Sequence, residues 1–448
     1  MEYLKRLILG FYGDDFTGST DAMEALDQYG LKTILFLKIP NEKMMERFQG
    51  VDCVGVAGTA RAKNRNGMEK ELVPVYDFFQ KINPYFVHYK VCSTFDSSPD
   101  VGSIGFAGDL ARNYFNKGNF PLLVAAPMLG RYTIFGNHFA AFQDKVYRLD
   151  RHPVMSRHPV TPMDEADLAV HLQKQTEQQI DKVSILDLEE QNVSEIIEKH
   201  AEEDNIVLFD ALNDIHMEKV SQVLWKMKGT DTQFLLGSSG IEYALGDAMK
   251  RNQVASRAEK DIAPSKIEKI FSVSGSVSEV TKQQLENAEE AGFHLEQIPY
   301  ELFTDEEKAE EFMGNIVKKI ELKKKVIIYT AKGPDDPIIE KTKQHLLEEG
   351  ISSEDTGIYI GRKLGEWTKK VLDQIEIKRL IISGGDTSGF VTSNLDIFGL
   401  EVLDSIAPGA PLCLAYSERP KFDGLEIALK SGQLGGPQFF EKVYQSGS

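Results

Sequence analysis

The strongest constraint on the fold is an alternation of short apolar runs with amphipathic stretches along the whole chain. Leu122–Ala126, Ile206–Phe209 and Leu380–Ser383 are nearly continuous in apolar residues, and turn-forming or polar residues follow them. A strand buried on both faces has this continuous apolar character, whereas a strand with one solvated face alternates. The pattern predicts an α/β fold with two domains, each built on a largely parallel sheet flanked by helices.

The same pattern places the individual strands. They are expected at Leu7–Phe11, Val54–Ala57, Phe86–Val91, Leu122–Ala126, Val183–Leu188, Ile206–Phe209, Phe234–Leu236, Ile270–Val273, Val326–Thr330, Leu380–Ser383, Leu412–Tyr416 and Ile427–Leu429. The chain has 448 residues, and a single core rarely grows beyond about 250–300 residues. Because residues 248–269 are polar and charged and contain Pro264, we predict domains at 1–250 and 269–448, joined by a linker at 251–268.

Charge and hydropathy exclude some classes of partner. The chain has 51 Lys and Arg against 69 Asp and Glu, a net charge of -18, which disfavours nucleic acids and anionic membranes. No apolar run is long enough to span a bilayer, and Asp14 and Asp15 interrupt the first apolar stretch, so we expect a core strand there and no leader peptide. Three cysteines, far apart, match no disulfide or zinc pattern, which predicts a cytoplasmic protein. A homo-oligomer is compatible with the sequence, which identifies no interface.

Charged residues follow three of the predicted strands in the first half. Asp14 and Asp15 come directly after the first strand, Arg61 follows the strand Val54–Ala57, and Lys90 lies at the end of Phe86–Val91. Ligands of parallel α/β sheets gather at the carboxyl ends of the strands. Carboxylates accept hydrogen bonds from hydroxyls, and cations bind an acid group, so this set predicts a site for a small hydroxy acid.

Two further segments extend this predicted site. Ser93 and Thr94 follow Lys90 and add hydroxyl groups beside the cation. His138 follows Arg131 in the chain, and both are predicted to reach the substrate. The histidines show no HxxxH or HExxH spacing, so zinc is not expected.

The second half carries loops of small residues after its strands. Ser272–Ser278 and Ser383–Gly389 each join a predicted strand to a helix, and Gly409 and Gly432 lie in further glycine-rich turns. Glycine lets the backbone approach a ligand closely, and free amides at a helix start attract phosphate. Neither loop fits GxxxxGK[ST] or GxGxxG, so P-loop and dinucleotide-binding motifs are absent. Asp386 could hold a magnesium-bound water or accept a proton.

These motifs, in this order, resemble the four-carbon acid sugar kinase family. The family's DDFTG motif is similar to Asp14–Gly18, its HPxTPM segment to His158–Met163, and its GSxG turn to Gly237–Gly240. Ser383–Gly389 and Leu429–Gly432 resemble its C-terminal nucleotide motifs.

Two other segments resemble particular branches of this family. The segment 90–98 is similar to the 3-oxo-tetronate kinase branch, because Phe95, Asp96 and Ser97 stand where threonate and erythronate kinases carry a basic residue and glycine. Residues 131–139 and 148–163 resemble a subgroup that acts on 3-oxo-isoapionate.

The resemblance implies an ATP-dependent kinase that phosphorylates a terminal hydroxyl of a four- to six-carbon sugar acid. The N-terminal domain would bind the acid, the C-terminal domain would bind ATP with Mg²⁺, and the two sites would face an interdomain cleft. By position, the substrate residues would be Asp14, Asp15, Arg61, Lys90, Ser93 and Thr94. The nucleotide residues would be Ser276, Gly384, Gly385, Asp386, Thr387 and Gly432, with Gly409 in a turn of the same half.

Two questions stay open at this point. Asp15 and Asp386 are both candidates for the carboxylate that accepts the hydroxyl proton. A sugar-acid lyase or isomerase would use the acid-binding half equally well, and a non-enzymatic sugar-acid sensor would bind the acid without turnover. The Gly- and Ser-rich second half favours the kinase, because a lyase needs no site for a polyphosphate.

Overall fold

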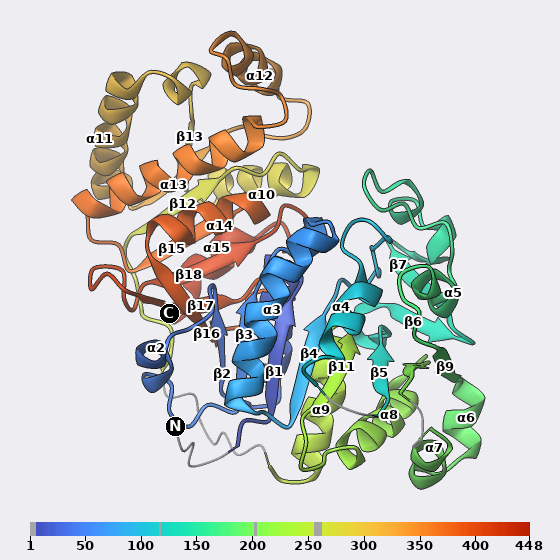
Figure 1. The fold of residues 1–448 in the computed structure, drawn as a ribbon. Helices are drawn as coiled ribbons and strands as arrows, with labels where there is room; N and C mark the ends of the chain where they lie inside the picture. The colour runs from blue at the N-terminus through green and yellow to red at the C-terminus, as the bar shows by residue number, and fades with distance from the viewer. Residues whose placement is uncertain (1–5, 116–117, 201–203, 255–261) are drawn as a thin grey trace. The chain divides into compact units, whose positions relative to one another are not determined.

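The computed structural model describes residues 6–115, 118–200, 204–254 and 262–448. The chain divides into two compact units, which we call the first unit (residues 1–258) and the second unit (residues 259–448). The division lies inside the segment 251–268 expected to be a linker, of which residues 255–261 lie outside the described residues. Both units combine strands and helices, as the sequence predicts (Figure 1).

The first unit is built on a parallel sheet with the strand order β2-β3-β1-β4-β11-β5-β10-β9. Every neighbouring pair in this order is parallel. The strands are β1 Leu9–Gly13, β2 Thr33–Phe36, β3 Cys53–Ala57, β4 Phe86–Lys90, β5 Phe120–Leu123, β9 Ile180–Val183, β10 Ile206–Phe209 and β11 Gln233–Gly237.

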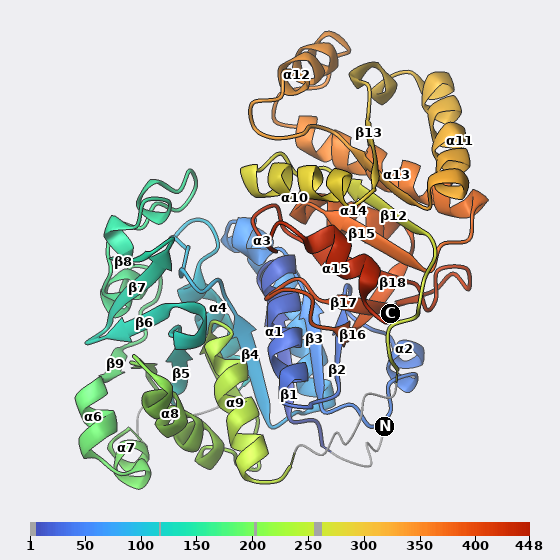
Figure 2. The ribbon, with the colours of Figure 1, turned by 180° about the vertical axis from the view of Figure 1, so that it is seen from behind.

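Helices cover both faces of this sheet. They are α1 Phe16–Gln28, α2 Glu42–Glu46, α3 Arg65–Ile82, α4 Ile104–Ala111, α5 Leu168–Gln173, α6 Ile185–Glu190, α7 Val193–Lys199, α8 Asp214–Lys226 and α9 Gly240–Arg251. Figure 1 shows α3 and α4 on the face toward the viewer, and Figure 2 shows α1 and α9 on the opposite face. This arrangement explains why the central strands are apolar on both sides.

A small antiparallel sheet is added to the first unit, and the sequence analysis did not anticipate it. Its strands are β6 Arg131–Ile134, β7 Asn137–Phe142 and β8 Lys145–Arg148, paired in the order β6-β7-β8. Several of their residues are only partly buried, so these strands lack the continuous apolar run by which the others were found.

The second unit is built on a mixed sheet with the order β13-β14-β12-β15-β18-β17-β16. The neighbouring strands in β13-β14-β12-β15-β18 are parallel to one another. Strand β17 is antiparallel to both β18 and β16. The strands are β12 Ile270–Ser274, β13 His294–Gln297, β14 Lys325–Tyr329, β15 Arg379–Ser383, β16 Ile397–Asp404, β17 Leu412–Ser417 and β18 Glu426–Lys430. The helices are α10 Glu279–Glu290, α11 Glu306–Lys323, α12 Ile338–Glu348, α13 Thr356–Gln374, α14 Gly385–Asn394 and α15 Phe439–Gln445.

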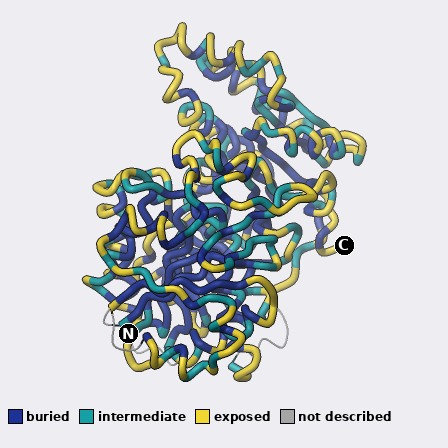
Figure 3. The backbone as a smooth tube through the Cα atoms, turned by 90° about the vertical axis from the view of Figure 1, so that its right-hand side faces the viewer, coloured by how far each residue is buried: buried dark blue, intermediate teal, exposed yellow. Residues whose placement is uncertain are grey.

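Burial follows the sheets. The strands β1, β4, β12, β15 and β18 are buried at every position, and Figure 3 shows the buried backbone inside and the exposed backbone at the outer helices and loops. Apolar side chains of α10 and α15 complete the core on one face of the second sheet. Because these strands are buried along their whole length, the residues at their ends have well-defined positions.

One predicted strand is wrong. Residues 183–188 were expected to form a strand, but β9 ends at Val183 and α6 begins at Ile185. Ser184 accepts a hydrogen bond from the Asp187 backbone N–H, and the Asp187 side chain accepts one from the Ser184 backbone N–H. This capping box starts a helix and so overrides the apolar character of the run.

No helix in the described ranges is long and apolar enough to cross a membrane. The cysteines Cys53, Cys92 and Cys413 are free thiols.

A buried ion pair fastens the C-terminal helix to the second sheet. Arg379 is fully buried, its Nη2 lies 2.5 Å from Oε2 of Glu426, and its Nη1 donates to the carbonyl oxygens of Val443 and Ser446. Removing the cation would leave the Glu426 carboxylate buried without its charge partner.

We therefore expect Arg379→Met to lower the free energy of unfolding of the second unit by about 3–5 kcal/mol. Urea unfolding followed by the fluorescence of Trp367, in a Trp225→Phe background, measures this unit, because the chain contains 2 tryptophans. The control Arg419→Met removes the exposed ion pair with Asp396 and should change the value by about 1 kcal/mol or less. Equal effects of the two variants would contradict the assignment.

Candidate functional site

The carboxyl ends of four strands of the first unit stand in one row. The register pairs Ala57 of β3 with Gly13 of β1, Gly13 with Lys90 of β4, and Lys90 with Gly237 of β11. Side chains that follow these strands therefore meet at one edge of the sheet. Four predicted substrate residues lie at this edge: Asp14, Asp15, Arg61 and Lys90.

Asp15 caps the helix α1 and forms an ion pair with Arg61. Its Oδ1 accepts a hydrogen bond from the Gly18 backbone N–H (2.9 Å) and so caps α1. Its Oδ2 accepts one from Nη2 of Arg61 at 2.5 Å, and Nε of Arg61 lies 3.9 Å from Oδ2 of Asp96. Burial opposes the charge of Arg61, but Asp15 and the other neighbours outweigh it, and the pKa of the guanidinium is raised. Arg61 is thus a charged group held between two carboxylates.

Asp14 is buried beside these charges. Its side chain is 2% exposed, and its Oδ1 has no hydrogen-bond partner in the described part of the chain. Burial raises the pKa of Asp14 well above its usual value, and Asp15 raises it further, whereas Arg61 and Lys90 oppose the shift. A buried oxygen without a hydrogen-bond partner destabilises the free protein. Such an oxygen is suited to accept a hydrogen bond from a ligand.

Lys90 is held by acidic groups from two helices. Its Nζ donates to the carbonyl oxygen of Val91 (2.9 Å) and lies 3.8 Å from Oδ2 of Asp21 in α1. Burial lowers the pKa of Lys90, but Asp21 and then Glu242 of α9 outweigh it, and the pKa is raised. Glu242 is itself buried, and its Oε1 lies 2.6 Å from Nδ1 of His88. Sequence reasoning missed Asp21 and Glu242, because both lie inside helices, beyond the short loops that directly follow the strands.

The loop after β4 is held by the small antiparallel sheet. Arg131 of β6 donates from Nε to Oγ of Ser93 (3.3 Å). Thr94 donates from Oγ1 to Oδ1 of Asp96 (3.3 Å), and Asp96 also neighbours Arg61. The fold therefore brings together three of the predicted substrate residues beside Arg61: Ser93, Thr94 and Arg131. Asp96 belongs to the same group, although it was noted only as part of a motif.

His138 is buried in this group and contacts the loop backbone. Its Nε2 lies 2.9 Å from the carbonyl oxygen of Ser93, so it donates there, and its Nδ1 then accepts from Oγ1 of Thr133 (3.0 Å). Burial lowers the pKa of His138 to about 4, so the ring is neutral near pH 7. Both ring nitrogens are occupied. The position of His138 favours a role in holding the loop, and direct contact with substrate stays a prediction.

A second row of strand ends lies in the second unit. The register pairs Ser274 of β12 with Ser383 of β15, and Ser383 with Lys430 of β18. Lys430 is 2% exposed and donates from Nζ to Oγ of Ser383 (3.0 Å) and to Oγ1 of Thr281 (3.3 Å). The sequence analysis included Lys430 in the segment Leu429–Gly432, which resembles a nucleotide motif, but did not single it out as a site residue. The signal was present, because Lys430 ends a strand before small residues as Lys90 does.

The loops beyond this row pack so closely that glycine is required. Gly384 has φ +127°, and a Cβ there would come within 2.8 Å of Oγ1 of Thr387. A Cβ at Gly432 would come within 2.5 Å of Oγ of Ser276. The helix α14 starts at the exposed Gly385, so the amides of its first turn have no partner within the helix. Five predicted positions thus lie at or beside one helix start: Ser276, Gly384, Gly385, Thr387 and Gly432.

Asp386 and Gly409 complete the predicted set in different ways. Asp386 is exposed in the first turn of α14 and forms no ion pair with a described residue. Gly409 has φ +72° in the turn before β17. Because β17 runs antiparallel to β18, this turn lies at the edge where β18 ends. The nucleotide role of Gly409 stays a prediction.

The residues of the second unit fit a polyphosphate. A buried lysine, a glycine loop at a helix start and the unpartnered Oγ of Ser274 offer a cation, backbone amides and a hydroxyl. Within the described ranges, no group of three or more His, Cys, Asp and Glu side chains could hold a metal ion. Asp386 is the carboxylate placed beside the helix start, and a phosphate-bound Mg²⁺ needs one or two such groups.

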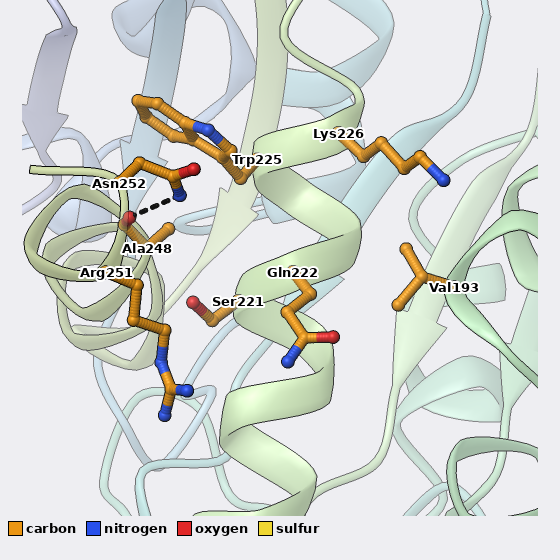
Figure 4. Close-up of a pocket in the computed structure, with 8 residues that line it drawn as sticks. All are labelled: Val193, Ser221, Gln222, Trp225, Lys226, Ala248, Arg251 and Asn252. Atoms are coloured by element: carbon orange, nitrogen blue, oxygen red, sulfur yellow. Dashed lines mark hydrogen bonds between the residues drawn. The ribbon is translucent and has the colours of Figure 1, made fainter.

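A separate cavity of about 290 Å³ lies between α7, α8 and α9 of the first unit. Figure 4 shows the residues that line it: Val193, Ser221, Gln222, Trp225, Lys226, Ala248, Arg251 and Asn252. Several of these residues lie at the C-terminal ends of α8 and α9, whereas the predicted residues follow the carboxyl ends of strands. The cavity contains none of the predicted site residues.

Comparisons with known proteins agree with two domains of different function. The family model described as a sugar-binding N-terminal domain matches residues 9–245, and the one described as a nucleotide-binding C-terminal domain matches residues 271–440. A Paraburkholderia graminis protein named 3-oxo-isoapionate kinase is 39% identical over 442 residues, covering 98% of this chain and 94% of that protein. A 3-oxo-tetronate kinase of Pseudomonas fluorescens is 27% identical over 448 residues, covering 98% and 96%.

Solved structures share the fold. A Salmonella typhimurium LT2 protein superposes with a TM-score of 0.80 at 22% identity, covering 98% of both chains. A Haemophilus influenzae protein gives 0.74 at 23% identity, covering 97% of this chain and 98% of that one. The matched domains define a class of proteins that pair a sugar-binding with a nucleotide-binding domain. The chain belongs to the four-carbon acid sugar kinase family.

The raised pKa of Asp14 predicts how stability changes with pH. In an unfolded chain an aspartate titrates near about pH 4, whereas folded Asp14 keeps its proton to higher pH. Above about pH 4 the folded protein thus holds a proton that the unfolded chain has lost, and stability falls as pH rises through the raised pKa. The melting temperature of the wild type should fall relative to that of Asp14→Asn over this window. A difference that does not vary with pH would contradict this account of Asp14.

Proposed function

We propose that this chain is an ATP-dependent kinase that transfers a phosphoryl group to a terminal hydroxyl of a short 3-oxo sugar acid. The observation that carries the proposal is the row of strand ends in the first unit, where cations and carboxylates stand together. The 39% identity to a 3-oxo-isoapionate kinase over 98% of the chain favours 3-oxo-isoapionate as the first substrate to test. Cytoplasmic location and self-association stay predictions from the sequence.

The first site supplies both kinds of group that a sugar acid needs. Arg61 is 31% exposed at the edge of the row and is the cation best placed to meet the acid group of the substrate. The unpartnered oxygen of Asp14 suits a sugar hydroxyl, because a carboxyl oxygen accepts a hydroxyl hydrogen bond. The hydroxyls of Ser93 and Thr94 extend the same surface. The protein would select its sugar acid by the distance between the charge of Arg61 and the groups that bind the sugar hydroxyls.

The chemical step breaks one bond and forms another. The substrate hydroxyl oxygen attacks the γ-phosphorus of ATP, the bond from that phosphorus to the β–γ bridging oxygen breaks, and ADP leaves. The hydroxyl proton passes to a carboxylate, for which Asp15 and Asp386 are the candidates. Bound Mg²⁺ would neutralise charge on the phosphates, and Asp386 is the residue that would hold it. The backbone amides at the start of α14 would orient the phosphates.

Turnover with a panel of acids tests the proposal. Purified protein with ATP, Mg²⁺ and 3-oxo-isoapionate, 3-oxo-tetronate, threonate or erythronate is assayed for ADP release. We expect release with the 3-oxo acids and much less with threonate and erythronate, because Phe95, Asp96 and Ser97 replace the residues typical of kinases for those acids. Absence of acid-dependent ADP release with every member would refute the kinase function.

Single substitutions separate the two candidate carboxylates. Asp15→Asn keeps an efficient N-cap for α1 but removes the charge, so kcat should fall by about 10²–10⁴-fold while ADP affinity changes little. Asp386→Asn should instead raise the Mg²⁺ and ATP concentrations needed for turnover. Asp100→Asn and Asp335→Asn remove exposed charges from the same units and should leave both parameters unchanged. If Asp15→Asn weakens ADP binding as much as it slows turnover, the division of roles is wrong.

A further inference from the structure

Lys430 is a buried cation without an anion. Its side chain is 2% exposed at the end of β18, and the groups that face its Nζ are the hydroxyls of Ser383 on β15 and Thr281 on α10. The ring of Phe439 on α15 lies 6.0 Å away. No carboxylate in the described part of the chain forms an ion pair with it. Two neutral acceptors leave one of its three N–H groups without a partner in these contacts.

The surroundings make this charge unfavourable in the free protein. Burial lowers the pKa of Lys430 to about 8. Thr281 lies in the first turn of α10, and Ser383 precedes the start of α14, so two helix N-termini add partial positive charge nearby. An anion that joins a buried ammonium among positive helix ends therefore stabilises its charged form.

Ser274, in the same row of strand ends, also lacks a hydrogen-bond partner among the described residues. Ser274 pairs with Ser383 in the register and is fully buried, and its Oγ has no hydrogen-bond partner in the described residues. Gly384 donates its N–H to the carbonyl oxygen of Lys430 (2.9 Å), and Gly432 lies against Ser276, so the glycine loops directly adjoin the lysine. A cation, an unused hydroxyl and the start of α14 at Gly385 therefore lie at one edge of the second sheet.

We propose that Lys430 is the cation that binds the phosphate chain of the nucleotide. This inference rests on the proposed kinase function and deepens it by naming the charged contact of the nucleotide site. An anionic phosphate oxygen supplies the missing partner of the ammonium, and the charge-assisted bond is stronger than the two bonds to hydroxyls. The bound phosphates also favour the protonated lysine, so nucleotide affinity should fall as pH rises above about 8.

Titration calorimetry with ADP and with adenosine, without any sugar acid, tests the inference. Lys430→Met should weaken ADP binding about 30-fold or more while adenosine binding changes little, because adenosine has no phosphate. Lys442→Met removes an exposed lysine from the same unit and serves as the matched control, with no change expected for either ligand. Inorganic tripolyphosphate should displace ADP from the wild type and from Lys442→Met far better than from Lys430→Met.

Stability and pH separate a binding role from a structural one. Without nucleotide, Lys430→Met should melt no lower than the wild type, because it removes an unpaired buried charge. If that variant does not fold, the ADP affinity of the wild type, measured between about pH 7.5 and about pH 9.5, tests the inference instead. We expect this affinity to fall as pH rises across the range.

Unchanged ADP affinity in Lys430→Met, equal losses for ADP and adenosine, or a flat pH dependence in the wild type would overturn the inference. Normal ADP binding through Lys430 with no acid phosphorylated would refute the kinase function alone.

Discussion

Parallel pairing in register is the constraint on which both candidate sites depend. In a parallel sheet the strands end at the same edge, so residues that are far apart in the chain become neighbours. The last residues of β3, β1, β4 and β11 are paired with one another, and those of β12, β15 and β18 likewise. Buried strands hold each row in place, so the side chains just beyond the strand ends are attached to a rigid part of the backbone.

The two rows differ in charge, and the difference matches two kinds of ligand. The first row brings Arg61 and Lys90 together with Asp15, Asp21 and Asp96. Opposite charges at short range suit a molecule with an acid group at one end and hydroxyls at the other. The second row has one buried cation, small residues and a helix start, which suit a ligand with several negative oxygens. Neither set would serve the other ligand well.

Much of this organisation could be predicted from the sequence, because buried strands have a simple signature. Ile206–Phe209 is a strand as expected. The strands that precede Asp14 and Arg61, and the strand that ends at Lys90, were found within two residues of their bounds. The signature failed where another interaction was stronger or the signal was weaker. A capping box turned residues 185–190 into a helix, and the half-exposed strands β6 to β8 have no continuous apolar run.

The site residues show the same limit. Adjacency to a strand end is visible in the sequence, which is why Asp15 and Arg61 could be paired with one ligand. Burial and partners are not visible, so nothing indicated that His138 would have both nitrogens occupied or that Glu242 would act on Lys90 from a helix. Long-range electrostatic partners depend on tertiary packing, which a local pattern does not encode.

Lys90 and Lys430 make this limit explicit. Each ends a buried strand at the edge of a parallel sheet, and each precedes a segment rich in small polar residues. Burial lowers the pKa of both, but Asp21 and Glu242 reverse the shift at Lys90, whereas nothing reverses it at Lys430. Lys90 is also 2% exposed, whereas the side chain of Arg61 is 31% exposed, so Arg61 is the cation more accessible to an acid substrate. The charge of Lys430 is not balanced by any carboxylate among the described residues. An anionic ligand would therefore form a stronger interaction with this lysine than its two hydroxyl partners do.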